Sequence, residues 1–66
     1  MSLRKFAGKK IRLVDKDGDI FEGVVGDYIW PDDNDPEIEA IIIDNPKYPN
    51  PMEFNAEEIK SIEIIS

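Results

Sequence analysis

Three aspartates at alternate positions, Asp15, Asp17 and Asp19, are the residues whose type and spacing come nearest to a metal site. A calcium loop of the EF-hand type needs glycine at its sixth position and a bidentate glutamate at its twelfth. Counted from Asp15, Gly18 stands fourth and Gly26 twelfth, so this pattern is not met. Glycine after Asp-Lys-Asp is instead typical of a tight hairpin turn. The spacing predicts a polar turn with no metal site.

Catalysis has few candidate residues. The chain contains no histidine and no cysteine, which removes the commonest general base, thiolate nucleophiles and the usual zinc ligands. It has no glycine-rich phosphate loop. The acidic loop from Pro31 to Pro36 could hold a divalent ion only weakly, and a solvated loop is the simpler interpretation. We therefore expect no enzyme, no cofactor and no metal.

Aromatic and basic side chains are the better candidates for binding. Tyr28 and Trp30 are two residues apart, which would place them on the same side of a strand. They could stack on a nucleobase or a proline-rich peptide, or they could cover one end of a small core. Tyr48 could extend this patch. Lys10 and Arg12 alternate in the same way and form the basic pair best placed to contact phosphates.

The charge is unevenly distributed. Residues 1–16 hold six basic residues and one acid, giving +5, whereas residues 17–66 hold two basic residues and fourteen acids, giving −12. The sum is the net charge of −7, with an isoelectric point near 4.3. Nucleic-acid-binding domains are usually basic overall, so this balance argues against that function.

The elements that must position these side chains are mostly strands. Alternating polar and apolar residues, turn signals and prolines divide the chain into short segments. We predict a helical turn at 2–7 capped by Ser2 and ended by Gly8, strands at 9–15, 19–30, 37–44, 52–55 and 59–65, and a 3₁₀ turn at 56–58. This predicts an all-β fold: a small, closed or nearly closed five-stranded barrel comprising one domain, residues 1–66. No apolar run reaches the length of a membrane span, so we expect a soluble cytoplasmic protein.

The pattern also assigns faces to the strands. In the second strand, Phe21, Gly23 and Val25 should point to one side, with Gly23 allowing the strand to coil. The β-branched run 41–43 predicts a third strand buried on both faces. In the last strand, Ile59, Ile62 and Ile64 are the expected inward anchors.

The chain resembles the Sm-like (LSM) domains, a subclass of SH3-like barrels. The resemblance lies in the short helix ending at Gly8, the turn at Asp17–Gly18, the segment 21–27 (Phe-Glu-Gly-Val-Val-Gly-Asp) and the closing strand 59–65. It implies ring assembly and binding of uridine- or adenine-rich RNA, with Asp27 at the family's aspartate position. The family's Arg-Gly pair before the last strand is absent, because residues 54–58 read Phe-Asn-Ala-Glu-Glu.

These observations favour a non-catalytic binding or assembly module whose partner is a protein or another copy of the chain. Ile62, Ile64 and Ile65 would give the closing strand an apolar edge for pairing. The alternative is an RNA-binding protein that uses five residues of the first two strands: Lys10, Arg12, Asp27, Tyr28 and Trp30. A third hypothesis is that the acidic surface imitates nucleic-acid phosphates.

Overall fold

The first two strands form a hairpin around the glycine turn. A computed structural model describes residues 2–34 and 37–65. β1 (Lys10–Asp15) and β2 (Ile20–Ile29) pair antiparallel with Leu13 opposite Phe21. Gly18 has a φ of +88°, a conformation that glycine adopts without steric cost, so the predicted turn is confirmed.

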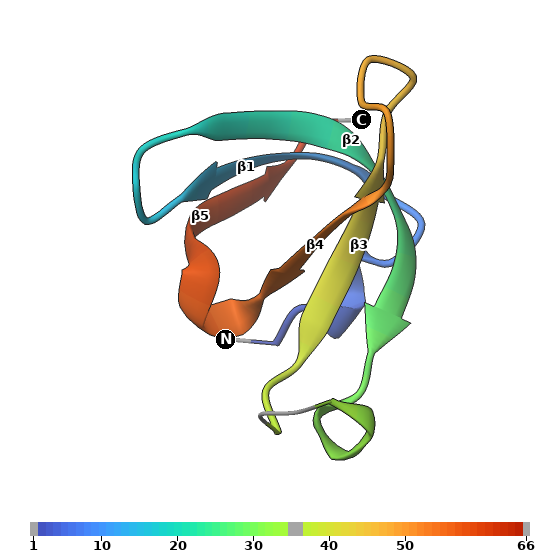
Figure 1. Cartoon of the computed structure of the whole chain (residues 1–66), viewed down its shortest axis with the longest axis vertical. Helices are drawn as coiled ribbons and strands as arrows, with labels where there is room; N and C mark the ends of the chain where they lie inside the picture. Colours follow the sequence, from blue (N-terminus) through green and yellow to red (C-terminus); the bar gives the residue numbers. More distant parts are fainter. Residues whose placement is uncertain (1, 35–36, 66) are drawn as a thin grey trace.

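The remaining strands complete a single five-stranded antiparallel sheet (Figure 1). β3 is Ala40–Asp44, β4 is Met52–Asn55 and β5 is Ile59–Ile64. The strand order is β4-β3-β2-β1-β5, so the sheet curls without closing, and β4 and β5 are its two edges. The all-β, five-stranded prediction is confirmed, and the barrel is an open one.

Three short 3₁₀ turns connect or flank the strands: η1 (Arg4–Phe6), η2 (Pro31–Asp33) and η3 (Ala56–Glu58). Gly8, with a φ of +76°, follows η1 as predicted. A capping box holds η3, because the Asn55 carboxamide accepts from the amides of Glu57 and Glu58, and the Glu58 carboxylate accepts from the Asn55 amide. This turn carries the chain from one edge strand of the sheet to the other.

The core lies on the concave side of the sheet. Residues at alternate positions of the strands meet there, together with Leu3 and Phe6 from the η1 segment. Its buried members are Leu3, Phe6, Ile11, Leu13, Val25, Ile41, Ile43, Phe54 and Ile59. Phe21 packs against this cluster and Gly23 is buried beside it, which confirms the predicted inward face of β2.

Gly23 allows β2 and β3 to approach closely. A Cβ on Gly23 would clash with the carbonyl oxygen of Asp44 and would lie 2.7 Å from Cγ2 of Ile43. Two register shifts bend the sheet further: one between Val25 and Asp27 in the β2–β3 ladder, and one between Val14 and Asp15 in the β1–β5 ladder.

Four predictions about these elements are wrong. Ser2 does not cap η1, whose N-cap is Leu3 without a side-chain hydrogen bond. β3 begins at Ala40 rather than at residue 37. It is not buried on both faces as predicted, because Ile42 points to the outer face between two inward neighbours and is only half-buried. Ile64 points to the core side but is not the predicted anchor: it is 49% exposed, because β5 is an edge strand and nothing in the described chain covers its end.

Candidate functional site

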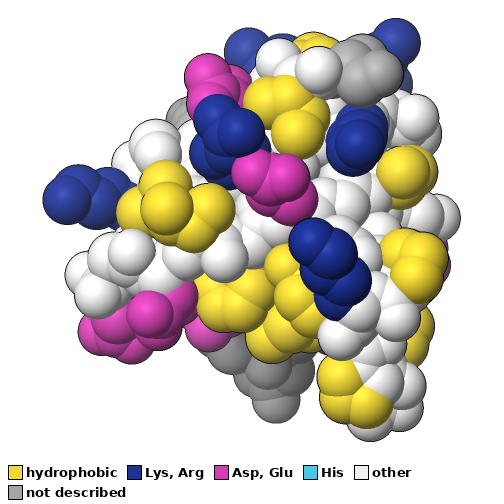
Figure 2. All heavy atoms as spheres, turned by 90° about the horizontal axis from the view of Figure 1, so that it is seen from above, with side chains coloured by type: hydrophobic (Ala, Val, Ile, Leu, Met, Phe, Trp, Pro, Cys, Tyr) yellow, Lys and Arg dark blue, Asp and Glu magenta, His cyan; other side chains and the backbone are white. Residues whose placement is uncertain are grey.

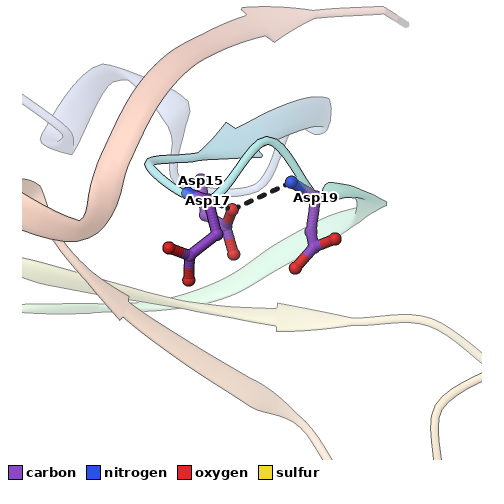
Figure 3. Close-up of side chains that lie close together, drawn as sticks. All are labelled: Asp15, Asp17 and Asp19. Carbon is purple, nitrogen blue, oxygen red and sulfur yellow. Dashed lines mark hydrogen bonds between the residues drawn. The ribbon is translucent and has the colours of Figure 1, made fainter.

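The acidic turn between β1 and β2 stabilises itself. The carboxylate oxygens of Asp15, Asp17 and Asp19 come within 4.8 Å of one another (Figure 3). One oxygen of Asp15 accepts from the amides of both Asp17 and Asp19, each at 2.9 Å. Asp17 and Asp19 are exposed. The carboxylate of Asp15 therefore acts in place of a backbone acceptor and organises the turn.

Arg12 lies between two carboxylates on the outer face of the sheet. Its Nε donates to Glu22 at 2.8 Å and its Nη1 to Glu63 at 3.2 Å, because these residues are its neighbours in the two flanking ladders. The hydrogen bond to Glu22 raises the pKa of Arg12, and the hydrogen bond to Arg12 lowers the pKa of Glu22. Arg12 shares the predicted face with Lys10, but its donors are engaged within the chain.

A shallow groove runs across the outer surface beside Lys10. One part, of about 480 Å³, is lined by Lys10, Val24, Asp44 and Lys47, among others. A contiguous part, of about 450 Å³, is lined by residues of the loop after β3: Asn45, Pro46, Tyr48, Pro49, Asn50 and Pro51. Its charged lining residues are of both signs, so the groove does not select an anion.

Tyr48 belongs to this loop and not to the aromatic patch at the end of β2. Its ring meets the edge of Phe21, with centroids 6.3 Å apart, and its hydroxyl accepts from the Glu22 amide. The Asn45 carboxamide donates to the Glu22 carbonyl and fixes the loop against β2. The suggestion that Tyr48 extends the Tyr28–Trp30 patch is wrong, because these contacts hold it near the start of β2.

Tyr28 and Trp30 are in contact, as their spacing predicts. Their rings make an edge-to-face contact with centroids 5.2 Å apart, and the Arg4 guanidinium lies 4.8 Å from the Trp30 ring centroid. The Tyr28 hydroxyl donates to Glu39 at 2.9 Å. Burial of Tyr28, together with this hydrogen bond, raises the pKa of its phenol. Trp30 is half exposed, so the patch covers an end of the core and also presents an indole to solvent.

Glu39 is the residue of this patch that the sequence analysis missed. Besides the Tyr28 hydroxyl, its carboxylate accepts from the Leu3 amide at 2.8 Å and so joins the N-terminal segment to β2. Asp27 is exposed, and its carboxylate accepts from the amide of Tyr28 at 2.8 Å. The structure thus brings Asp27, Tyr28 and Trp30 to one end of β2, while Lys10 and Arg12 lie on β1.

The residues predicted for the oligomer edge lie together along β5. Ile62 is half-buried against the core, Ile64 is exposed, and Ile65 is half-buried with its amide donating to the Lys10 carbonyl. Ile62 lies opposite Leu13, and Ile64 opposite Ile11, so both isoleucines face the core side of the sheet. β5 is thus an edge strand whose core-side residues Ile62 and Ile64 are apolar.

The surface charge is mixed. Figure 2 shows lysine, arginine, aspartate and glutamate side chains interspersed with hydrophobic ones on the upper face, with no continuous basic area. A phosphate backbone binds best to a field of one sign. On this face, acidic side chains therefore interrupt the basic edge that the sequence predicts.

No protein-family model, curated protein or solved structure matches this chain. No helix among the described residues has the length and hydrophobicity needed to cross a membrane.

Proposed function

We propose that this chain is a non-catalytic module that binds a protein strand, or another copy of itself, along the edge of β5. The observation that carries the proposal is the edge itself: β5 is hydrogen-bonded to β1 on one side and to no described strand on the other. An exposed edge with an apolar flank accepts an added strand by main-chain hydrogen bonding. Ile64 supplies that flank.

The displaced pKa values support a non-catalytic function. The pKa values of Arg12 and Tyr28 are raised and that of Glu22 is lowered, so each group moves away from neutrality. A general acid or base works best when its pKa is brought toward the working pH. The groove beside Lys10 is also too shallow to exclude water from a reaction.

The Sm-like assignment and a cytoplasmic location are part of the same proposal. Support for the assignment comes from the turn at Gly18, the inward Phe21 and Gly23, and the short helical turn η1 that precedes Gly8. All three are features that the resemblance in the sequence depends on.

Single-stranded RNA is the second candidate partner, and one contact favours it. The half-exposed Trp30 with Arg4 beside its ring is an arrangement on which a base can stack near a cation. Arg12 is not part of this candidate site, because two carboxylates engage it.

A strand-binding assay separates the two candidates. The probe is a synthetic peptide with the sequence of residues 59–65, added to the ¹⁵N-labelled chain. We expect the amide signals of Ile62 and Ile64 to shift, and Ile64→Asp to abolish the effect, whereas Ile20→Asp on the exposed start of β2 is the matched control. Shifts confined to Trp30 on addition of a uridine-rich RNA, weakening steeply with salt, would favour the second candidate and contradict the first.

A further inference from the structure

The backbone groups that point away from the sheet along β5 can be assigned. The Ile65 amide donates to the Lys10 carbonyl, which makes these two residues a hydrogen-bonded pair. Hydrogen-bonded pairs alternate along an antiparallel ladder, so Glu63 pairs with Arg12 in the same way. The amides and carbonyls of Ile62 and Ile64 consequently face outward, where no described strand meets them.

The other edge of the sheet is protected. The Ala56 amide donates to the Glu39 carbonyl, so Phe54 and Met52 direct their backbone groups to β3, and Glu53 and Asn55 direct theirs outward. The Asn55 amide is already occupied by the Glu58 carboxylate. Pro51, just before β4, has no amide proton to offer. Within β4, Glu53 alone keeps an unoccupied outward amide.

We propose that the strand added to β5 is β5 of a second copy, antiparallel, with a two-fold axis at Ile62. This inference rests on the proposed function and specifies its partner. A head-to-tail ring would need β4 as the acceptor, and β4 is short and protected. Pairing β5 with itself uses the open edge twice and gives a closed dimer, since a two-fold interface is self-complementary.

Charge selects the register. The outward backbone groups of two copies can pair in three registers: Ile62 opposite Ile62, Ile62 opposite Ile64, or Ile64 opposite Ile64. The second register places Glu63 directly opposite Glu63 of the other copy, which is destabilising. In the third register the two strands overlap only at Ile64, because β5 ends there. The first register puts Glu63 opposite Ser61 and overlaps both strands from Lys60 to Ile64.

The first register also continues the apolar row of the sheet. On the core side, Phe21, Leu13 and Ile62 lie in line across β2, β1 and β5. The two-fold axis extends this row through Ile62, Leu13 and Phe21 of the second copy. Exposed Ile64 lies beside the row and loses contact with water in the dimer.

Cysteine cross-linking tests the register directly, because the natural chain has no cysteine. In the proposed dimer, Ile62 of each copy forms a hydrogen-bonded pair with a Cα separation of about 5.5 Å, within disulfide range. Under mild oxidation, Ile62→Cys should form a dimer of twice 7.6 kDa. Ser61→Cys alone should stay monomeric in reducing-agent-free gels, and a mixture of Ser61→Cys with Glu63→Cys should cross-link.

Cross-linking of Ser61→Cys alone, or failure of Ile62→Cys to cross-link while the chain is dimeric in solution, would refute the register. Failure of all these variants to cross-link, with a solution mass of 7.6 kDa, would refute the dimer of two folded copies. In that case, a peptide of residues 59–65 that still shifts the Ile62 and Ile64 amides would leave the proposed function standing, and absence of both effects would overturn it too.

Proline supplies a second test that leaves the fold intact. Because the Ile64 amide faces outward, Ile64→Pro removes no bond of the β1–β5 ladder. It removes an edge donor from each copy, so the dimer dissociation constant should rise by roughly tenfold or more. Ile64→Val is the matched control and should dimerise. Equal dimerisation of the proline variant, with an unchanged circular dichroism spectrum, would refute the proposal.

Salt gives an independent readout. Each copy carries a net charge of −7, so the two copies repel one another. Screening by added salt should strengthen the dimer, whereas it weakens any complex with nucleic acid. A dimer that dissociates as salt rises would contradict pairing between two acidic copies.

Discussion

Replacement of Gly23 by alanine should destabilise the fold, and replacement of Gly26 should not. A methyl group on Gly23 would meet the backbone carbonyl of Asp44 and, at 2.7 Å, a methyl of Ile43. The carbonyl belongs to the ladder opposite Val24 and cannot move without separating β3 from β2. On Gly26 the added methyl would meet only the carboxylate of exposed Asp44, which can rotate away.

The magnitude follows from two opposing contributions. Overpacking a tight site costs about 1–3 kcal/mol, and alanine recovers about 0.4–1 kcal/mol by restricting the unfolded chain. The net loss for Gly23→Ala is therefore about 0–2.6 kcal/mol, centred on about 1.3 kcal/mol, a sizeable share of the roughly 3–10 kcal/mol expected for a domain of this size. For Gly26→Ala the overpacking cost does not apply, so the variant should be as stable as the wild type or more stable by up to about 1 kcal/mol.

Thermal unfolding followed by circular dichroism measures the difference. At about 4–8 °C per kcal/mol for a domain of this size, the central loss of about 1.3 kcal/mol for Gly23→Ala should lower the Tm by about 5–10 °C. Gly26→Ala is the matched control, since both glycines lie in the same strand. A Tm for Gly23→Ala equal to or above that of Gly26→Ala would show that β2 and β3 do not approach as closely as the structure has them.

Three further predictions concern the core, the ion pair and the cap. Leu13→Ala should lower the free energy of unfolding in urea by about 2–5 kcal/mol because it empties a fully buried site, whereas Ile20→Ala, at a 63% exposed position, should change it little; equal losses would contradict the assigned core. Arg12→Gln should raise the pKa of Glu22, measured by NMR titration. A carboxylate whose pKa is lowered in the folded state stabilises the fold at pH values above its unfolded pKa. The wild type should therefore be more stable than the variant near neutral pH, and this difference in the free energy of unfolding should disappear as the pH falls through the folded pKa of Glu22. An advantage that persists in acid would exclude this ion pair as its source. Asn55→Ala should cost about 1 kcal/mol of stability in the same urea assay by breaking the capping box, and an unchanged midpoint would show that the cap contributes nothing.

Local sequence signals were sufficient to predict the number of strands and their order along the chain, but not where β3 begins. Alternation identified β1 and the inward face of β2, and the turn at Gly18 follows from the conformational freedom of glycine. The bounds of β4 and η3 are as predicted, because proline precedes one and an asparagine cap begins the other. These elements depend on residues within a few positions of each other in the chain.

The partners of the site residues could not be predicted in the same way. Alternation indicates that Arg12 faces outward, but the two glutamates beside it follow from the pairing registers of β1 with β2 and β5. Similarly, the pattern marks Ile64 as apolar and on the core side, and only the strand order reveals that the strand has an open edge. Long-range placement of this kind leaves no trace in local spacing.

The positive charge of the first sixteen residues has a role within the fold. The Arg12 guanidinium joins β2 to β5 through Glu22 and Glu63, Arg4 lies over Trp30, and the ammonium of Lys5 lies 5.3 Å from the centroid of the Phe6 ring. Charges engaged in this way are less available to a phosphate backbone. The carboxylate of Glu63 is held toward Arg12 on the outer face, so Lys60 is the other charged side chain of β5 that can protect its edge. Engagement of Arg12 by two glutamates thus disfavours nucleic-acid binding, and the open edge that the strand order leaves on β5 favours strand pairing.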